Sequence, residues 1–168
     1  MTFKQGIAPL VKVGLARYRV GEAPMRMMTM ALGSCLGIVL FDPEACIGAM
    51  AHVMHPSREN VKNNYNKAKF VDSAIALMLD RMLKREAVKE RICAKIFGGA
   101  RMFDHLVGNS DIPQIGDRNV SAARAELKMR GIPITKESVG GNIGRTIIFD
   151  LSNGSVCVRY AYNKEEIL

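Results

Sequence analysis

The sequence predicts an α+β fold of packed β-sheets flanked by helices. Many short apolar runs are separated by turn residues, as is typical of strands. Only two stretches carry apolar residues at spacings of three and four, as amphipathic helices do. The chain has 168 residues, 48% of them hydrophobic and 24% charged, which is ordinary for a globular protein. We therefore expect residues 1–168 to form a single domain.

The first part of the chain predicts strands and tight turns. Val11, Val13 and Leu15 alternate with other residues, as in a half-buried strand. Further strands are expected at 27–30, 36–41 and 47–54, with turns at 21–24 and 42–44. The polar segment 57–66 is expected to be a loop.

The second part predicts both helices and a hairpin. Apolar residues recur at helical spacing between 68 and 84, which favours an amphipathic helix. A second helix is expected to start at Asn119 as its N-cap and to end at Gly131, after an irregular segment at 108–118. Strands are expected at 92–97, 132–138, 146–151 and 155–160, the last two joined by a turn at 152–154.

Charge and hydropathy limit the classes of partner and location. The net charge is +8, which favours an acidic partner. Tryptophan is absent and the cations are dispersed, so a nucleic-acid partner is not expected. No apolar run is long enough for a transmembrane helix, and the N-terminal residues lack the apolar core of a signal peptide. We expect a cytoplasmic protein that is not integral to a membrane.

One of the four cysteines lies in a segment suited to chemistry. Cys35 lies in MALGSCLGIV, close to Gly33 and Gly37, and His52 follows in AMAHVMHP. A histidine can activate a thiol, and glycine backbone amides can point at a developing oxyanion. The third group that would orient the imidazole is Thr29, Ser34 or His55. Spacing alone leaves open whether Cys35 is a nucleophile or a small buried hydrophobic residue.

Metal and nucleotide sites are weaker interpretations. His52 and His55 form an HxxH pattern, but on a strand these side chains point to opposite faces, and Pro56 argues against a helix there. No metal is therefore expected. The glycine pairs at 98–99 and 140–141 lack the surrounding pattern of a phosphate-binding loop, so we expect tight turns there.

Several segments together resemble a known family. TMALGSCLGIVLFD, IGAMAHVMHP, KFVDSAIALML, AKIFGGARMF, IGDRNV and GGNIGRTIIFD occur in this order between Thr29 and Asp150. They resemble the CheD family of chemoreceptor glutamine deamidases. The resemblance implies hydrolysis of glutamine side chains on methyl-accepting chemotaxis receptors, giving glutamate and ammonia through a cysteine thioester, without any cofactor. It also implies a fold like the catalytic domain of the cytotoxic necrotizing factor toxins.

The same resemblance implies roles for individual residues. The catalytic residues would be Cys35, His52 and Thr29, with Ser34 and Gly33 placing the oxyanion or the substrate. A CheC-type chemotaxis phosphatase is the implied partner, with a docking surface near Gly98, Gly99, Ala100 and Phe103. His55 departs from the family, which commonly has leucine there.

Two functions remain open from the sequence, beside a less favoured third, a basic nucleic-acid binder whose affinity would fall steeply with salt. The first is a protein-glutamine deamidase, and the second is a non-catalytic adaptor that binds the phosphatase or the receptor. A catalytic Cys35 is expected to be alkylated faster than the other cysteines, with a pH midpoint below that of an ordinary thiol.

Overall fold

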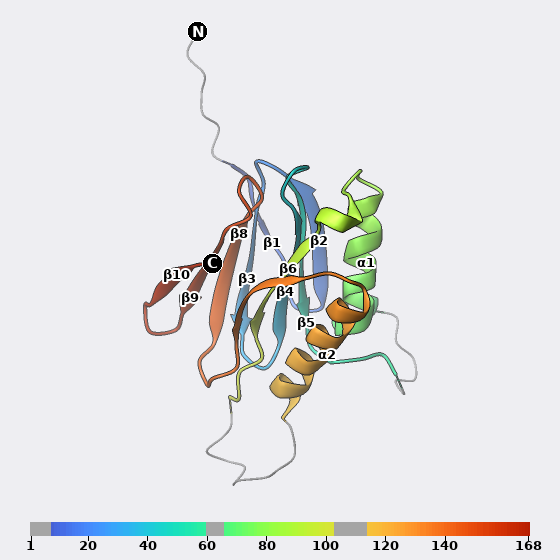
Figure 1. The fold of residues 1–168 in the computed structure, drawn as a ribbon. Coiled ribbons are helices and arrows are strands. Elements are labelled where there is room, and N and C mark those ends of the chain that lie inside the picture. The colour runs from blue at the N-terminus through green and yellow to red at the C-terminus, as the bar shows by residue number, and fades with distance from the viewer. Residues whose placement is uncertain (1–7, 60–65, 103–113) are drawn as a thin grey trace.

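The computed structural model describes residues 8–59, 66–102 and 114–168. Its strands form two mixed five-stranded sheets, called here sheet I and sheet II (Figure 1). Sheet I has the order β1 (Leu10–Lys12), β3 (Arg26–Leu32), β8 (Arg145–Asp150), β9 (Val156–Tyr160), β10 (Glu165–Ile167). Sheet II has the order β2 (Arg17–Glu22), β5 (Ile47–Val53), β4 (Leu36–Asp42), β6 (Cys93–Gly98), β7 (Ile134–Val139). The β1–β3 and β6–β7 pairs are parallel, and the other pairs are antiparallel.

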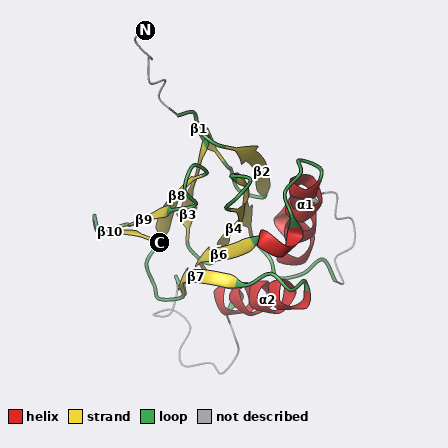
Figure 2. Ribbon diagram, turned by 45° about the horizontal axis from the view of Figure 1, so that its top comes forward, coloured by secondary structure: helices red, strands yellow, loops and turns green. Residues whose placement is uncertain are grey.

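The two sheets and the helices form three layers. Helices α1 (Val71–Leu83) and α2 (Ile115–Met129) lie beside sheet II on the face away from sheet I (Figure 2). One apolar cluster fills the space between sheet II and these helices, and a second fills the space between the sheets. Every residue of β4 is buried, because both faces of this strand are covered. That burial explains why its sequence is an almost continuous apolar run.

Most predicted elements are present with small shifts at their ends. The expected strands at 27–30, 36–41, 47–54, 92–97 and 132–138 correspond to β3, β4, β5, β6 and β7, and the expected hairpin is β8–β9. Helix α1 begins at Val71, because Lys67–Lys69 form a separate 3₁₀ turn and Phe70 is extended. Strands β2 and β10 were not predicted. Both lie at the edges of their sheets and carry several charged residues, so their apolar alternation is weak.

The start of the second helix was predicted wrongly. Helix α2 begins at Ile115, so Asn119 lies inside it rather than at its N-cap, and residues 115–118 are helical rather than irregular. The side chain of Asn119 is fully buried and bonds to other segments of the chain. Asparagine was taken as a cap because it usually is one, but here tertiary hydrogen bonds use the side chain instead.

Two further expectations concern the whole fold. Within the described residues, neither α1 nor α2 is long and apolar enough to cross a bilayer. The α+β class with packed sheets and flanking helices is confirmed. The likeness to the catalytic domain of the cytotoxic necrotizing factors and the single domain over 1–168 stay predictions.

Candidate active site

Two of the residues expected to be catalytic, Thr29 and His52, are in hydrogen-bond contact across the space between the sheets. The third, Cys35, lies on the same side of sheet II, and no hydrogen bond joins it to His52 Nε2 in the described part of the chain. Thr29 lies on β3 of sheet I, and His52 lies on β5 of sheet II. Cys35 directly precedes β4, in which Gly37 is paired with His52. Residues two apart on a strand share a face, so Cys35 lies diagonally across from His52. The side chain of Cys35 packs against the apolar cluster between the sheets, which is the side that Thr29 approaches.

A short hydrogen-bond chain fixes the state of the His52 ring. Thr29 Oγ1 donates to the carbonyl oxygen of Val13 at 2.7 Å and lies 2.8 Å from His52 Nδ1. A hydroxyl has one hydrogen to donate, and a carbonyl can only accept it. Thr29 Oγ1 must therefore accept from His52 Nδ1–H, which leaves Nε2 without a hydrogen. Nε2 has no hydrogen-bond partner in the described part of the chain, so its lone pair is available as a base.

Burial holds both reacting groups in their neutral forms. His52 is only 3% exposed, and burial lowers its pKa to about 4. Burial also raises the pKa of the Cys35 thiol above its usual range. The sequence predicted a lowered thiol pKa; that expectation is wrong here, since an uncharged imidazole offers no positive charge to stabilise a thiolate. Near pH 7 the two side chains are therefore a neutral thiol and a neutral imidazole.

Glycine at position 37 lets the two sheets approach each other at this site. A Cβ atom on Gly37 would lie 2.8 Å from Ile147 Cδ1 and 2.9 Å from Leu32 Cδ1, and 3.6 Å from Thr29 Cγ2. The pairing of β3 with β8 is interrupted between Thr29 and Leu32, where Ala31 has a φ of 59°. Bulges of this kind redirect a strand next to a functional site. The irregularity begins just after Thr29, which still reaches across to His52.

Residues 33–35, called here the nucleophile loop after the expected role of Cys35, are held by their backbone carbonyls. The carbonyl of Gly33 accepts from Ala100 N at 2.7 Å, and that of Cys35 accepts from Gly99 N at 2.9 Å. The carbonyl of Ser34 accepts from the Asn119 side chain at 3.0 Å. The amide N–H groups of Ser34 and Cys35 have no acceptor among the residues that the structure describes. These two donors are therefore free to bind an oxyanion.

The segment expected to lie near a docking surface packs against the backbone of Cys35. Gly98, Gly99 and Ala100 are buried, and a Cβ atom on Gly98 would lie 2.3 Å from the Cys35 carbonyl oxygen. Their backbone supports the nucleophile loop, and a docking surface near them stays a prediction. Phe103, the fourth residue of that expectation, lies outside the described residues.

Two residues that shape this loop, Asn119 and Gly116, were not among the expected site residues. Asn119 bonds to Ser34, and Gly116 packs against the Gly99 backbone, where a Cβ atom would lie 2.7 Å from the carbonyl oxygen. Both lie in IGDRNV, near the start of α2. Glycine and asparagine are poor residues for a helix interior, and that conflict was the available signal.

His55 does not share the surroundings of His52. Its ring lies against Phe70, with 5.7 Å between the ring centroids, and Lys69 lies near it. Burial, followed by the positive charge of Lys69, lowers the pKa of His55. The HxxH pattern therefore does not form a pair of ligands, and His55 does not orient His52, since Thr29 has that contact.

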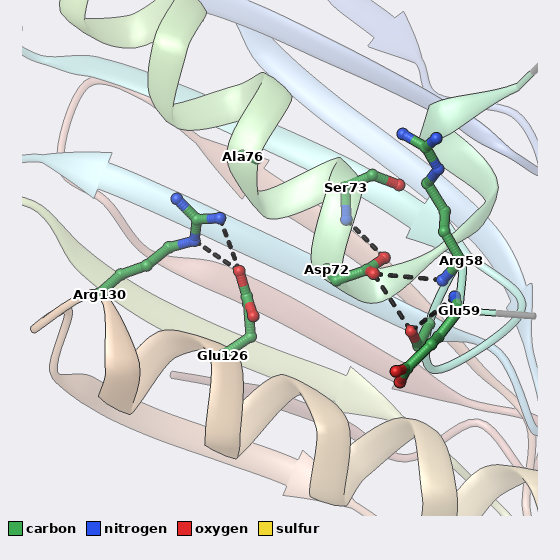
Figure 3. Close-up of a pocket in the computed structure, with 8 residues that line it drawn as sticks. Arg58, Glu59, Asp72, Ser73, Ala76, Glu126 and Arg130 are labelled. Atoms are coloured by element: carbon green, nitrogen blue, oxygen red, sulfur yellow. Dashed lines mark hydrogen bonds and ion pairs between the residues drawn. The ribbon is translucent and has the colours of Figure 1, made fainter.

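A groove between α1 and α2 lies apart from these residues (Figure 3). Arg130 pairs with Glu126 in this groove, and Asp72 accepts from Ser57 Oγ and from the backbone nitrogen of Arg58. None of Thr29, Cys35 and His52 lines it. The groove holds neither a cysteine nor a histidine among its lining residues, so the candidate active site remains the one between the sheets.

Two solved structures show partial likeness to the chain. A Neisseria meningitidis protein, NMB0706 of the family-model DUF152, matches with a TM-score of 0.48 and 12% identity, over 80% of this chain and 65% of that one. The Bacillus licheniformis hypothetical protein YfiH matches with a TM-score of 0.45 and 16% identity, over 72% and 49%.

Sequence comparisons give a much stronger match. The family model described as "CheD chemotactic sensory transduction" matches residues 54–160. A protein of Caldanaerobacter subterraneus named "Probable chemoreceptor glutamine deamidase CheD" is 43% identical over 150 residues, covering 89% of this chain and 92% of that protein. A Syntrophomonas wolfei protein of the same name is 40% identical over 162 residues, covering 96% and 100%. These matches agree with the resemblance of the ordered motifs, and the chain belongs to the CheD family.

Proposed function

We propose that this protein hydrolyses glutamine side-chain amides of chemoreceptors, with Cys35 as nucleophile. The observation that carries this proposal is the Val13–Thr29–His52 hydrogen-bond chain, which leaves a bare His52 Nε2 on the face that Cys35 shares. A thiol with a base oriented by a third group is the arrangement that covalent amide hydrolysis needs. The names of the relatives support the substrate class.

The reaction proceeds in two steps. In the first, Cys35 Sγ attacks the amide carbon while His52 Nε2 takes the thiol proton. The C–N bond then breaks, and His52 returns the proton to the leaving nitrogen, so that ammonia and a thioester form. In the second, His52 takes a proton from water, the hydroxide attacks the thioester, and the proton returns to Cys35. Glutamate is released, and no cofactor takes part.

Backbone amides stabilise the tetrahedral intermediates in this proposal. The N–H groups of Ser34 and Cys35 lack acceptors among the described residues, while the carbonyls of Gly33, Ser34 and Cys35 are all bonded. Donors fixed in advance and directed at a developing oxyanion supply a large share of catalysis in acyl transfer. Gly33 contributes by its backbone, which Ala100 holds.

The partners follow from the substrate. Methyl-accepting receptors, predicted from the sequence, are the proposed substrates, and the net charge of +8 suits an acidic partner. A cytoplasmic location and binding of a CheC-type phosphatase belong to the same proposal. The role of non-catalytic adaptor remains the alternative, and it predicts binding without turnover.

The direct test is the intact mass of a chemoreceptor cytoplasmic fragment after incubation with the protein. Each deamidated glutamine should add about 1 Da, because hydrolysis of an amide replaces NH₂ with OH. Peptide mapping then locates the sites. Absence of a shift on several receptors from the same cell, with correctly folded protein, would favour the adaptor.

A substitution at Thr29 tests how His52 is oriented. Thr29→Val keeps the shape but removes the acceptor for Nδ1–H, so kcat should fall by about 10²-fold, in the range of general acid–base contributions. Thr29→Ser retains the hydroxyl and should restore most of the rate. Steady-state kinetics of the three proteins would check this. Equal losses in both variants would show that packing of the methyl group, rather than the hydroxyl, is what matters.

A further inference from the structure

Asn119 is a buried polar side chain that lies at the end of the strand pair carrying the active site. It is 0% exposed, and its Nδ2 group donates to the carbonyl of Ser34 at 3.0 Å and to that of Met54 at 3.1 Å. Ser34 directly precedes Cys35, and Met54 directly follows the strand of His52. One side chain of α2 thus bonds to both segments that carry the proposed reacting groups.

The two hydrogen bonds of Asn119 Nδ2, called here the Asn119 bridge, join the ends of two neighbouring strands. The β4–β5 pairing ends with Leu36 opposite Val53, so Cys35 and Met54 lie just beyond the last paired residues. Each of these two residues bonds to another segment, Cys35 O to Gly99 N and Met54 N to Lys69 O, but the β4–β5 ladder does not continue between them. Ends of a ladder open more easily than its middle. Because both Nδ2 hydrogens are used, the amide holds the two ends at a defined spacing. Cys35 adjoins one of these two ends, and His52 lies two residues before the other.

Helix α2 supports the same loop from a second point. Gly116 packs against the Gly99–Ala100 backbone so closely that a Cβ atom would lie 2.7 to 2.9 Å from it. Gly99 N and Ala100 N in turn donate to the carbonyls of Cys35 and Gly33. With Asn119 on Ser34, three consecutive carbonyls of the nucleophile loop are each bonded, and the direction of the N–H groups between them is set.

A buried asparagine at position 119 is less favourable for stability than an apolar residue would be if the position served packing alone. The neighbouring buried residues of α2 are apolar: Val120, Ala123 and Leu127. Asn119 Oδ1 is buried without a hydrogen-bond partner among the described residues, which costs stability. Local costs of this kind are expected where a residue serves a site rather than the fold.

We propose that Asn119 is a positioning residue, which sets the spacing of Cys35 and His52 and the direction of the Ser34 and Cys35 amides. The proposal rests on the proposed deamidase function. Asn119 should affect the rate of the chemical step rather than substrate affinity, because it is buried and does not reach the substrate.

The test compares Asn119→Asp and Asn119→Leu with Leu127→Ala. Both Asn119 variants lose the bridge at similar side-chain volume, and Leu127→Ala destabilises the same helix away from the loop. Per folded protein, kcat should fall at least about tenfold in both Asn119 variants, with KM within about twofold, and should be unchanged in Leu127→Ala. A kcat within twofold of wild type in both Asn119 variants, or an equal fall in Leu127→Ala, would overturn the proposal.

Amide hydrogen exchange separates this proposal from the proposed function. The Gly99 and Ala100 amides, which bond to the nucleophile loop, should exchange about tenfold faster in the Asn119 variants, with those of β8 unchanged. Faster exchange confined to these amides in a protein without deamidase activity would support the bridge and contradict the proposed function alone. Unchanged exchange at Gly99 and Ala100 would overturn the bridge, whatever the activity.

Discussion

Replacement of Cys35 by alanine should abolish deamidation and leave the fold intact. The proposed thioester cannot form without Sγ, so the rate should fall by more than about 10³-fold, as happens when a covalent nucleophile is removed. Cys35 is half-buried and lies in a loop held by its backbone carbonyls, which alanine retains. The measurement is the mass gain of the receptor fragment over time.

Cys93→Ala is a matched control for this experiment. Cys93 is also half-buried and packs against the same apolar cluster between the sheets, and its thiol donates to the carbonyl of Phe41 at 3.6 Å. Cys93→Ala should retain full activity. Deamidation that persists in Cys35→Ala would show that water, and not this thiol, attacks the amide.

Replacement of His52 by glutamine should give the second large loss of activity. Glutamine can still donate to Thr29 Oγ1, but it has no atom that takes up the thiol proton at neutral pH. We expect kcat to fall by about 10²- to 10⁴-fold, which is the usual contribution of general acid–base catalysis. A His55→Gln control should change kcat little, because His55 lies against Phe70 and away from Thr29. Similar losses in both variants would place the base elsewhere.

His52→Gln should also change how the free energy of unfolding depends on pH, because it removes the buried imidazole. His52 has a pKa of about 4 in the fold and an ordinary value near 6.5 in the unfolded chain. Above pH 6.5 both states are neutral, and the group does not alter stability. As pH falls from 6.5 to 4, the unfolded chain takes up the proton first, so the folded state loses up to about 3 kcal/mol.

Denaturant unfolding of wild type and His52→Gln at a series of pH values measures this difference. The stability of the variant relative to wild type should rise by that amount between pH 6.5 and pH 4, with the other titrating groups common to both proteins. A constant difference across this range would mean that His52 is hydrated or charged in the fold. It would also contradict the neutral thiol–imidazole pair.

The sequence by itself determined the fold class, most strands, helix α1 and the identity of the candidate catalytic residues. The fold class, the strands and helix α1 follow from local information, and the candidate catalytic residues follow from the resemblance of the ordered motifs to a family. The apolar runs of β4 and β5, the stripe of α1 and the turn at 152–154 each reflect burial or backbone geometry within a few neighbouring residues. The family resemblance selected Thr29 from among Thr29, Ser34 and His55 as the residue that orients His52.

Only the tertiary structure decided how those residues are arranged and hydrogen-bonded. That Thr29 accepts from Nδ1 depends on the carbonyl of Val13, and that both reacting groups are neutral depends on the closure of sheet I over sheet II. The role of Asn119 depends on two carbonyls brought together by separate strands. Contacts between residues far apart in the chain leave no periodic pattern, so only the packed structure shows them.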